Sequence, residues 1–164
     1  MAQKYPIIGL TGPRQSGKTT LLKTPFSDYQ YVSLENPDNR NFAENDPNGF
    51  FKQYSSKVII DEAQRVPSIF SYLQTIVDQS GEMGQFILSG SQNFHLMHNI
   101  TQSLAGRVAI LKLLPFDNQE LKIANLLNDD YLPMLTKGFY PAIYDRDIPY
   151  KIFYSNYIQT YVQS

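Results

Sequence analysis

Residues 12–19 read Gly-Pro-Arg-Gln-Ser-Gly-Lys-Thr and match the pattern G-x-x-x-x-G-K-[ST] without a gap. The run follows a short apolar stretch at residues 7–10 and precedes a segment that Pro25 ends. The fixed glycines let the backbone take positive φ and approach a bound group without a Cβ in the way. This order of strand, glycine-rich turn and helix predicts a phosphate-binding loop within an α/β fold.

Each position in this loop has an expected role. Backbone amides from about Gln15 to Thr19 are expected to meet phosphate oxygens at the start of the helix. Lys18 is expected to reach the β and γ phosphates, and the Thr19 hydroxyl to ligate Mg²⁺. We therefore expect nucleotide binding by Gly12, Pro13, Arg14, Gln15, Ser16, Gly17, Lys18, Thr19 and Thr20. The alternative, a glycine-rich turn with an exposed lysine, is disfavoured because the flanking strand and helix are both present.

Short apolar runs alternate with longer amphipathic segments along the rest of the chain. Further strands are predicted at residues 31–34, 57–60, 86–88 and 108–114. Residues 37–54 are predicted to form two short helices split at Asp46-Pro47, and apolar residues recur at helical spacing across 66–77. This alternation is typical of a parallel sheet covered by helices.

A second motif closes the third predicted strand, where Val58-Ile59-Ile60 runs into Asp61-Glu62. Asp61 is expected to hold magnesium through water, and Glu62 to polarise the water that attacks the γ phosphate. Two acids at a strand end are also explained by solvated surface charges. Their place one strand–helix–strand unit after the loop favours the catalytic interpretation. An aspartate followed directly by a glutamate indicates ATPases of the RecA and AAA+ type, and the chain contains no N-K-x-D guanine signature.

The fourth predicted strand ends in Ser89-Gly90-Ser91-Gln92-Asn93. In RecA and AAA+ ATPases an extra strand lies between the loop strand and the acidic strand, and its polar tip faces the γ phosphate. That arrangement gives an expected strand order of 5-1-4-3-2. We assign the role of orienting the water to Ser91, with Ser89 and Gln92 as alternatives that the sequence leaves open. A plain Ser/Gly/Asn turn is the alternative explanation of the same composition.

Arg107 lies just before the fifth predicted strand, where AAA+ proteins often carry an arginine that completes a neighbouring subunit's site. A guanidinium in that position neutralises charge that develops on the transferred phosphoryl group. The sequence supports a surface arginine or a structural ion pair equally well. It also leaves open whether Arg107 acts within its own subunit or on a neighbour.

Composition narrows the classes of function. The chain has 164 residues, which suffices for one domain with a core of its own. Its formal net charge of -1 gives no indication of a nucleic-acid partner, and its apolar runs are too short for a membrane span. The absence of cysteine rules out disulfides, thiolate metal sites and cysteine nucleophiles, and it fits a cytoplasmic protein.

We expect a P-loop core at residues 1–114 and a helical extension at residues 115–164. Within the extension, four tyrosines fall on one helix face: Tyr150, Tyr154, Tyr157 and Tyr161. Little sequence remains after them to cover this face. We therefore expect the face to pack on something outside this chain.

Four strings in order closely resemble one family: TGPRQSGKTT at 11–20, IIDEAQ at 59–64, LSGSQ at 88–92 and SLAGR at 103–107. The chain resembles the AAA-type ATPase domain of bacterial and archaeal ATP-binding proteins that carry a further C-terminal region with a nuclease-like fold. The resemblance covers essentially the whole chain and implies ATP and Mg²⁺ as ligands. Members of that family continue well beyond the equivalent of Tyr161. The resemblance therefore implies a truncated chain, whose partner is a second copy of itself or the missing C-terminal region.

Together these observations predict a three-layer α/β P-loop NTPase that binds Mg·ATP and hydrolyses it. The expected catalytic residues are Glu62, Lys18, Arg107 and Ser91, and the expected metal ligands are Thr19 and Asp61. One alternative is an ATP-dependent switch or interaction module with little hydrolysis of its own. Another is a small-molecule kinase, which usually needs an arginine-rich lid, and residues 37–54 contain only Arg40.

Overall fold

The computed structural model describes residues 1–91, 100, 102–127 and 131–162. The chain divides into two compact units. The first comprises Met1–Arg14 and Lys18–Leu113, and the second comprises Gln15–Gly17 and Leu114–Ser164. Among the described residues, none of the helices is both long enough and apolar enough to cross a membrane.

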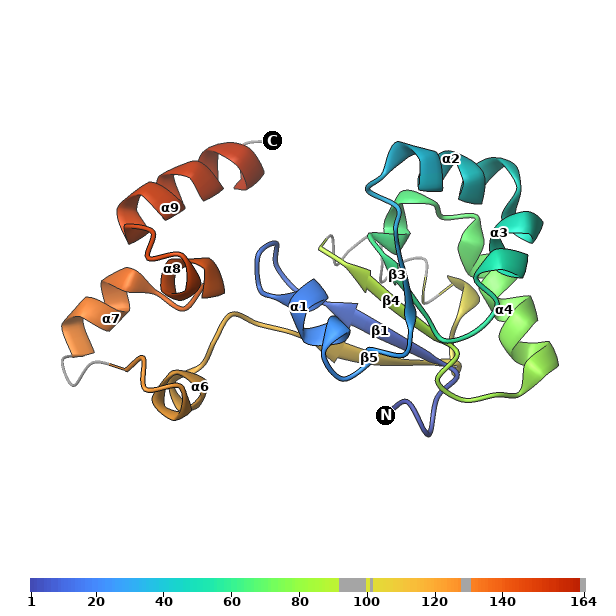
Figure 1. Cartoon of the computed structure of the whole chain (residues 1–164), viewed down its shortest axis with the longest axis horizontal. Helices are drawn as coiled ribbons and strands as arrows, with labels where there is room; N and C mark the ends of the chain where they lie inside the picture. The colour runs from blue at the N-terminus through green and yellow to red at the C-terminus, as the bar shows by residue number, and fades with distance from the viewer. Residues whose placement is uncertain (92–99, 101, 128–130, 163–164) are drawn as a thin grey trace. The chain divides into compact units, whose positions relative to one another are not determined.

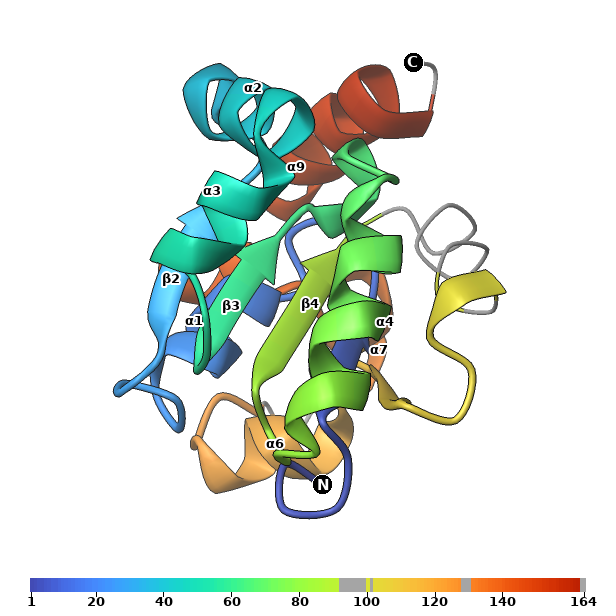
Figure 2. The same ribbon diagram turned by 90° about the vertical axis from the view of Figure 1, so that its right-hand side faces the viewer.

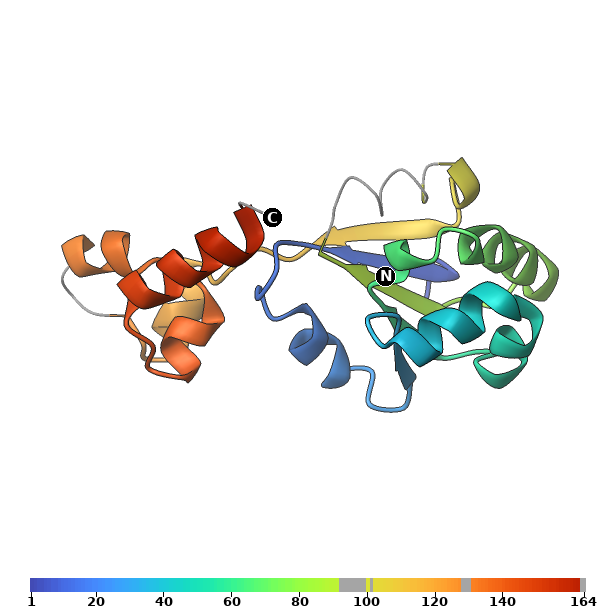
Figure 3. The ribbon, with the colours of Figure 1, turned by 90° about the horizontal axis from the view of Figure 1, so that it is seen from above.

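A five-stranded parallel sheet forms the centre of the first unit (Figure 1, Figure 3). Its strands are β1 (Ile7–Thr11), β2 (Gln30–Ser33), β3 (Val58–Asp61), β4 (Phe86–Gly90) and β5 (Val108–Lys112). Their order is β2-β3-β4-β1-β5, and every pairing is parallel. This is the predicted order 5-1-4-3-2 read from the other edge, so the prediction is confirmed.

Each face of the sheet has its own hydrophobic core, because successive strand residues point to opposite faces. Ile60 and Leu88 belong to the core that includes side chains of α2 (Pro37–Asn45), α3 (Pro47–Gln53) and α4 (Ile69–Ser80). Figure 2 shows α4 running alongside β4. Their neighbours Ile59 and Ile87 belong to the opposite core, with Leu22 of α1 (Lys18–Lys23). The sheet therefore lies between helical layers, which confirms the three-layer α/β prediction.

Asp46 explains why residues 37–53 form two helices instead of one. Asp46 is the C-cap of α2, where its backbone N–H donates a hydrogen bond to the Phe42 carbonyl oxygen. The same residue is the N-cap of α3, where its side chain accepts a hydrogen bond from the Gly49 N–H. Pro47 follows at the first position of α3, where its missing N–H costs no helical hydrogen bond. The predicted break at Asp46-Pro47 is confirmed.

The register of the strands gathers polar residues at one edge of the sheet. Thr11 pairs with Gly90, and Asp61 pairs with Ser89. Because all strands run the same way, the loop after β1, the acids that close β3 and the tip of β4 meet at this carboxyl edge. That edge carries the candidate site.

The second unit consists of short helices. They are α6 (Asn118–Ile123), α7 (Tyr131–Lys137), α8 (Pro141–Asp145), α9 (Tyr150–Tyr157) and the π-helical turn η2 (Ile158–Val162). Asp117 and Glu120 form a reciprocal capping box that starts α6.

An aromatic cluster in this unit corrects one prediction. The ring of Tyr140 lies 5.1 Å from that of Tyr157 and 6.2 Å from that of Tyr154. The Tyr154 hydroxyl donates a hydrogen bond to the Lys137 carbonyl oxygen at 3.2 Å. The prediction that the tyrosine face packs outside the chain is therefore wrong for Tyr154 and Tyr157, because residues 137–140 cover them.

Candidate functional site

The loop of residues 12–19 joins the end of β1 to the start of α1. Three of its residues have positive φ, Gly12 at 156°, Gln15 at 61° and Gly17 at 90°, and the last two have the values of a sharp turn. Gly17 takes this conformation without steric cost, whereas it is uncommon for a residue such as Gln15. A loop with such turns directs successive backbone N–H groups toward one concave side and so forms an anion-binding nest.

Lys18 is the buried cation of the loop, with 7% of its surface exposed. Its Nζ donates hydrogen bonds to the carbonyl oxygens of Gly12 at 3.0 Å and Pro13 at 2.8 Å. Burial lowers the pKa of Lys18, while the charges of Glu62 and Asp61 act in the opposite direction. The ammonium group is thus held between the loop carbonyls and the field of the two acids.

Asp61 is oriented by hydroxyl groups from three different elements. Ser89 at the tip of β4 donates to its Oδ1, and Tyr31 of β2 donates to its Oδ2 at 2.7 Å. Thr19 of α1 donates to the same Oδ2 at 3.4 Å. Burial and the hydrogen bond to Asp61 raise the pKa of Tyr31 to about 12, so this phenol stays protonated and remains a donor.

The pair of Thr19 and Asp61 fits a magnesium ion. Hydroxyl and carboxylate oxygens are the hard ligands that Mg²⁺ prefers. In phosphate-binding sites Mg²⁺ uses one or two carboxylates together with phosphate oxygens instead of a cage made only of protein side chains. No group of three or more His, Cys, Asp or Glu side chains that could hold a metal occurs in the described part of the chain.

Glu62 follows Asp61 in a left-handed backbone conformation, with φ of 54° and ψ of 41°. This conformation costs about 1–2 kcal/mol for a residue with a side chain, and such strained residues cluster at active sites. It turns the chain into the 3₁₀ helix η1 (Ala63–Arg65). The Oε2 of Glu62 accepts hydrogen bonds from Gln64 Nε2 at 2.5 Å and from Ser91 Oγ at 3.2 Å. Ser91 and Glu62 therefore lie in direct contact.

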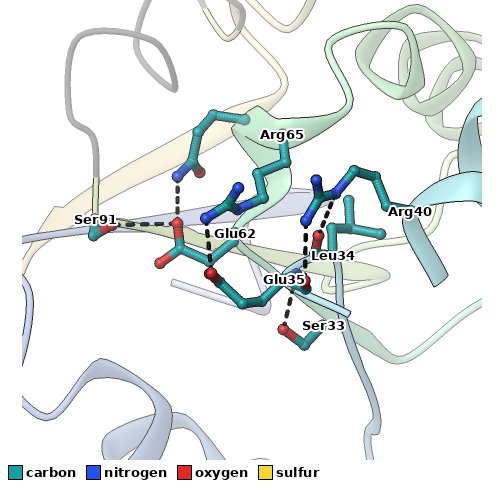
Figure 4. A network of polar contacts seen from close by, with 8 residues as sticks. Ser33, Leu34, Glu35, Arg40, Glu62, Arg65 and Ser91 are labelled. Atoms are coloured by element: carbon teal, nitrogen blue, oxygen red, sulfur yellow. Dashed lines mark hydrogen bonds and ion pairs between the residues drawn. The ribbon is translucent and has the colours of Figure 1, made fainter. Parts of the chain in front are cut away.

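Figure 4 shows an ion pair beside Glu62. The Nη2 of Arg65 lies 2.7 Å from Oε1 of Glu35, and both side chains are partly exposed. Arg40 of α2 donates to the carbonyl oxygens of Leu34 and Glu35, each at 3.0 Å. A partly exposed pair contributes little to stability. Its effect is to fix the segment after β2 next to the acidic end of β3.

The structure thus brings together five of the predicted site residues: Lys18, Thr19, Asp61, Glu62 and Ser91. Of the alternatives to Ser91, Ser89 contacts Asp61 instead of Glu62, and Gln92 lies outside the described residues. Thr20 follows Thr19 in α1 and is exposed. The remaining predicted residues belong to the loop itself and line it by continuity of the chain: Gly12, Pro13, Arg14, Gln15, Ser16 and Gly17.

Arg107 is not brought to the site of its own chain. It precedes Val108, which pairs with Ile7 at the start of β1, whereas the loop follows the end of β1. With a rise of about 3.3 Å per residue, the length of a five-residue strand, about 16 Å, separates the two edges. Arg107 instead forms two hydrogen bonds with Asp78 of α4, at 2.6 and 2.7 Å. Of the interpretations left open by the sequence, a role within its own subunit is therefore disfavoured.

Sequence reasoning missed two residues that contact the acids. Tyr31 reaches Asp61 from β2, and Gln64 reaches Glu62 from η1. The string IIDEAQ contains Gln64, but its contact depends on the left-handed turn at Glu62, which no local pattern predicts. For Tyr31 the sequence carries no signal, because the contact depends on the pairing of β2 with β3.

A parallel sheet with a phosphate-binding loop after one strand and an Asp-Glu pair at the end of another defines a P-loop NTPase. Residues 4–122 match the family described as AAA domain, and the chain belongs to that family. The match and the fold support a nucleotide-binding function of the ATPase type.

The chain is also similar to two curated proteins and to a solved structure. Two mycobacterial proteins, uncharacterized protein Mb2031c of Mycobacterium bovis and uncharacterized protein Rv2008c of Mycobacterium tuberculosis, are each 38% identical to this chain over 113 residues. That alignment covers 67% of this chain and 25% of each relative, so the matched region spans a quarter of their length. The Walker-type ATPase PABY2304 of Pyrococcus abyssi shares the fold, with a TM-score of 0.57 at 15% identity. The likeness covers 95% of this chain and 67% of that one.

Proposed function

We propose that this chain binds Mg·ATP at the carboxyl edge of its sheet and hydrolyses it. The observation that carries the proposal is the direct contact of the loop residue Thr19 with Asp61, next to a glutamate that Ser91 holds in place. A binding loop alone supports nucleotide capture. A metal aspartate and an oriented glutamate beside that loop support hydrolysis as well.

Binding of the phosphates is assigned to the backbone of residues 12–19, with Lys18 and Thr20 contributing side chains. Lys18 already lies across the loop, held by the carbonyl oxygens of Gly12 and Pro13. A buried ammonium held in this way is preorganised for phosphate, because little side-chain freedom is left to lose on binding. Its lowered pKa reflects the cost of burying the charge, and an anionic phosphate offsets that cost.

Thr19 and Asp61 are assigned to the magnesium ion. Bound Mg²⁺ neutralises charge on the phosphate oxygens and orients them. Ser89 and Tyr31 hold the Asp61 carboxylate by its two oxygens, Oδ1 and Oδ2 respectively. Such supporting donors orient a metal ligand before the metal binds.

Glu62 is assigned to the proton of the attacking water. Ser91 and Gln64 donate to its Oε2, and among the described residues no hydrogen bond reaches its Oε1. The carboxylate is thus fixed in orientation while one oxygen remains available as a proton acceptor. Ser91 is assigned the role of holding Glu62 toward the water.

Arg107 is assigned to the site of a second copy of the chain. Its position at the opposite edge of the sheet, paired with Asp78, leaves it available only to a neighbour. In such an assembly the exposed ion pair with Asp78 opens at small cost. The division into a core at residues 1–114 and a helical extension at 115–164 forms part of the same proposal.

The second candidate function is an ATP-dependent switch with little hydrolysis. It is favoured by the position of Arg107 at the opposite edge of the sheet. Without Arg107 at its own site, an isolated chain lacks a cation that the reaction uses to neutralise developing charge. The two functions share the binding chemistry and differ only in turnover.

A single-turnover experiment separates the two. The chain is mixed in excess over ATP in the presence of Mg²⁺, and ADP is measured over time for the wild type and for Glu62→Gln. Hydrolysis predicts ADP formation in the wild type and a rate about 10²-fold or more lower in Glu62→Gln, with bound ATP in both. Bound ATP that persists equally in both proteins supports the switch and refutes the hydrolase.

A further inference from the structure

We propose that Gln64 is a positioning residue that anchors one carboxylate oxygen of Glu62, so that the other oxygen faces the attacking water. The proposal rests on the function proposed above, because it explains how the glutamate of that site is held. The side chain of Gln64 donates a hydrogen bond to Glu62. Among the described residues, it makes no hydrogen bond to the binding loop or to the proposed metal ligands.

The contact is built by the backbone of the turn. Glu62 is left-handed, and η1 begins immediately after it. This turn carries the side chain of Gln64 back over the residue two positions earlier, where its Nε2 lies 2.5 Å from Glu62 Oε2. An extended strand would instead place residues 62 and 64 side by side on one face, with their side chains parallel. The strained conformation at Glu62 therefore has an identifiable result, which is the bond to Gln64.

Burial indicates that Gln64 is kept for this contact. Only 7% of the residue is exposed, and its Oε1 is buried with no hydrogen-bond donor among the described residues. A buried amide with an unpaired oxygen destabilises a fold relative to an apolar side chain of the same shape. Because Gln64 lacks a full set of structural partners, its Nε2 bond to Glu62 is the feature that accounts for an amide in this place.

Two donors on one oxygen define the orientation of the carboxylate. Ser91 approaches Oε2 from the tip of β4 and Gln64 approaches it from η1. With Oε2 held from two elements, rotation of the carboxylate is restricted and Oε1 is directed away from both donors. Ser91 makes the longer of the two contacts, at 3.2 Å. Each of the two donors therefore contributes to the restraint.

The test compares Gln64→Met with a matched control, Gln85→Met. Methionine keeps the length of the side chain and removes its donor. Gln85 is also buried, and it also donates to a glutamate, Glu82, but it lies just before β4 at the opposite edge of the sheet. For each variant we would measure the single-turnover rate, the Kd for Mg·ATP and the midpoint of thermal unfolding. The same measurements on Glu62→Gln and on the double variant Glu62→Gln/Gln64→Met complete a cycle.

Gln64→Met is expected to lower the turnover rate about 10-fold or more, while the Kd for Mg·ATP stays within about twofold. The loss of rate is expected to be a part of the roughly 10²–10⁴-fold that a general base contributes, because Glu62 is still present but is less well oriented. In the Glu62→Gln background the same change is expected to have no further effect on the rate, because the group that Gln64 positions is gone. Gln85→Met is expected to keep the wild-type rate. A merely structural role for Gln64 predicts instead a lower unfolding midpoint with an equal fractional loss of rate in both backgrounds.

Two other results are decisive. A wild-type rate in Gln64→Met, with Glu62→Gln still impaired, overturns the role of Gln64 and leaves the proposed hydrolase intact. Equal rates of ADP formation in the wild type and Glu62→Gln overturn the assignment of Glu62, and the role of Gln64 with it, while the absence of ADP formation in both refutes the hydrolase.

Discussion

Replacing Lys18 by alanine has an effect on nucleotide binding that follows directly from the geometry. The Lys18 ammonium makes hydrogen bonds of 3.0 and 2.8 Å within the loop, and it lies in the field of Asp61 and Glu62. On binding it is expected to exchange these partners for phosphate oxygens. Hydrogen bonds to charged groups contribute about 1.5–3 kcal/mol each, and because the exchange gives up two bonds to neutral carbonyl oxygens, the loss of Lys18 is expected to cost up to about 3 kcal/mol. That cost corresponds to a Kd for Mg·ATP up to about 150-fold higher.

Isothermal titration calorimetry with Mg·ATP measures this difference, and Lys52→Ala provides the control. Lys52 is an exposed residue of α3, so its replacement removes the same charge without touching the loop. Its Kd is expected to stay within about twofold of the wild type, since exposed charges at a distance are screened by salt. The reasoning is refuted if Lys18→Ala binds Mg·ATP as tightly as the wild type, or if Lys52→Ala loses as much affinity.

Three further outcomes follow from the same contacts. In the wild type, Mg²⁺ should lower the Kd for ATP, and Asp61→Asn should remove most of this Mg²⁺ effect. Titrations of both proteins with and without Mg²⁺ measure it, and an unchanged effect in Asp61→Asn would show that Asp61 does not hold the metal. The hydrogen bond from Arg107 lowers the pKa of Asp78 in the folded protein below the ordinary value of 3.8. The ion pair therefore stabilises the fold at pH values above 3.8, and this stabilisation is lost as the pH falls through the folded-state pKa. The gap in unfolding free energy between the wild type and Arg107→Ala should therefore be present at neutral pH and close in acid; a gap independent of pH contradicts the ion pair. Finally, a mixture of Arg107→Ala and Lys18→Ala chains should regain some turnover if Arg107 serves a neighbour, whereas no recovery would leave it a structural residue.

Much of the fold could be predicted because its determinants are local or tightly spaced. The string at residues 12–19 requires a strand before it and a helix after it, and the structure has both. The Asp46-Pro47 break was readable because both residues favour the start of a helix. The strand order followed from the class of ATPase that the Asp61-Glu62 pair indicates, and the structure confirms it.

What could not be predicted depends on contacts between elements far apart in the sequence. Tyr31 lies 30 residues before Asp61, and only the pairing of β2 with β3 brings them together. The spacing of the tyrosines in α9 shows which residues share a face, but it does not show what covers that face. The ring of Tyr140 and the Lys137 carbonyl do so in the structure.

The Asp78–Arg107 pair shows the same limit for a charged residue. Sequence position favoured a finger arginine about as much as the alternative, a surface arginine or a structural ion pair. The bidentate contact with Asp78 selects the ion pair for the isolated chain. The role toward a neighbour remains a prediction, which the mixing experiment tests.

The measurement that tests the central claim most directly is a crystal structure of the Glu62→Gln chain with Mg·ATP. The substitution is expected to keep ATP intact while preserving the shape of the site. We expect the phosphates to lie in the loop of residues 12–19 within hydrogen-bond distance of Lys18, with Mg²⁺ beside Thr19 and Asp61. A nucleotide bound elsewhere, or a metal ion that contacts neither Thr19 nor the Asp61 carboxylate directly or through water, would contradict the account.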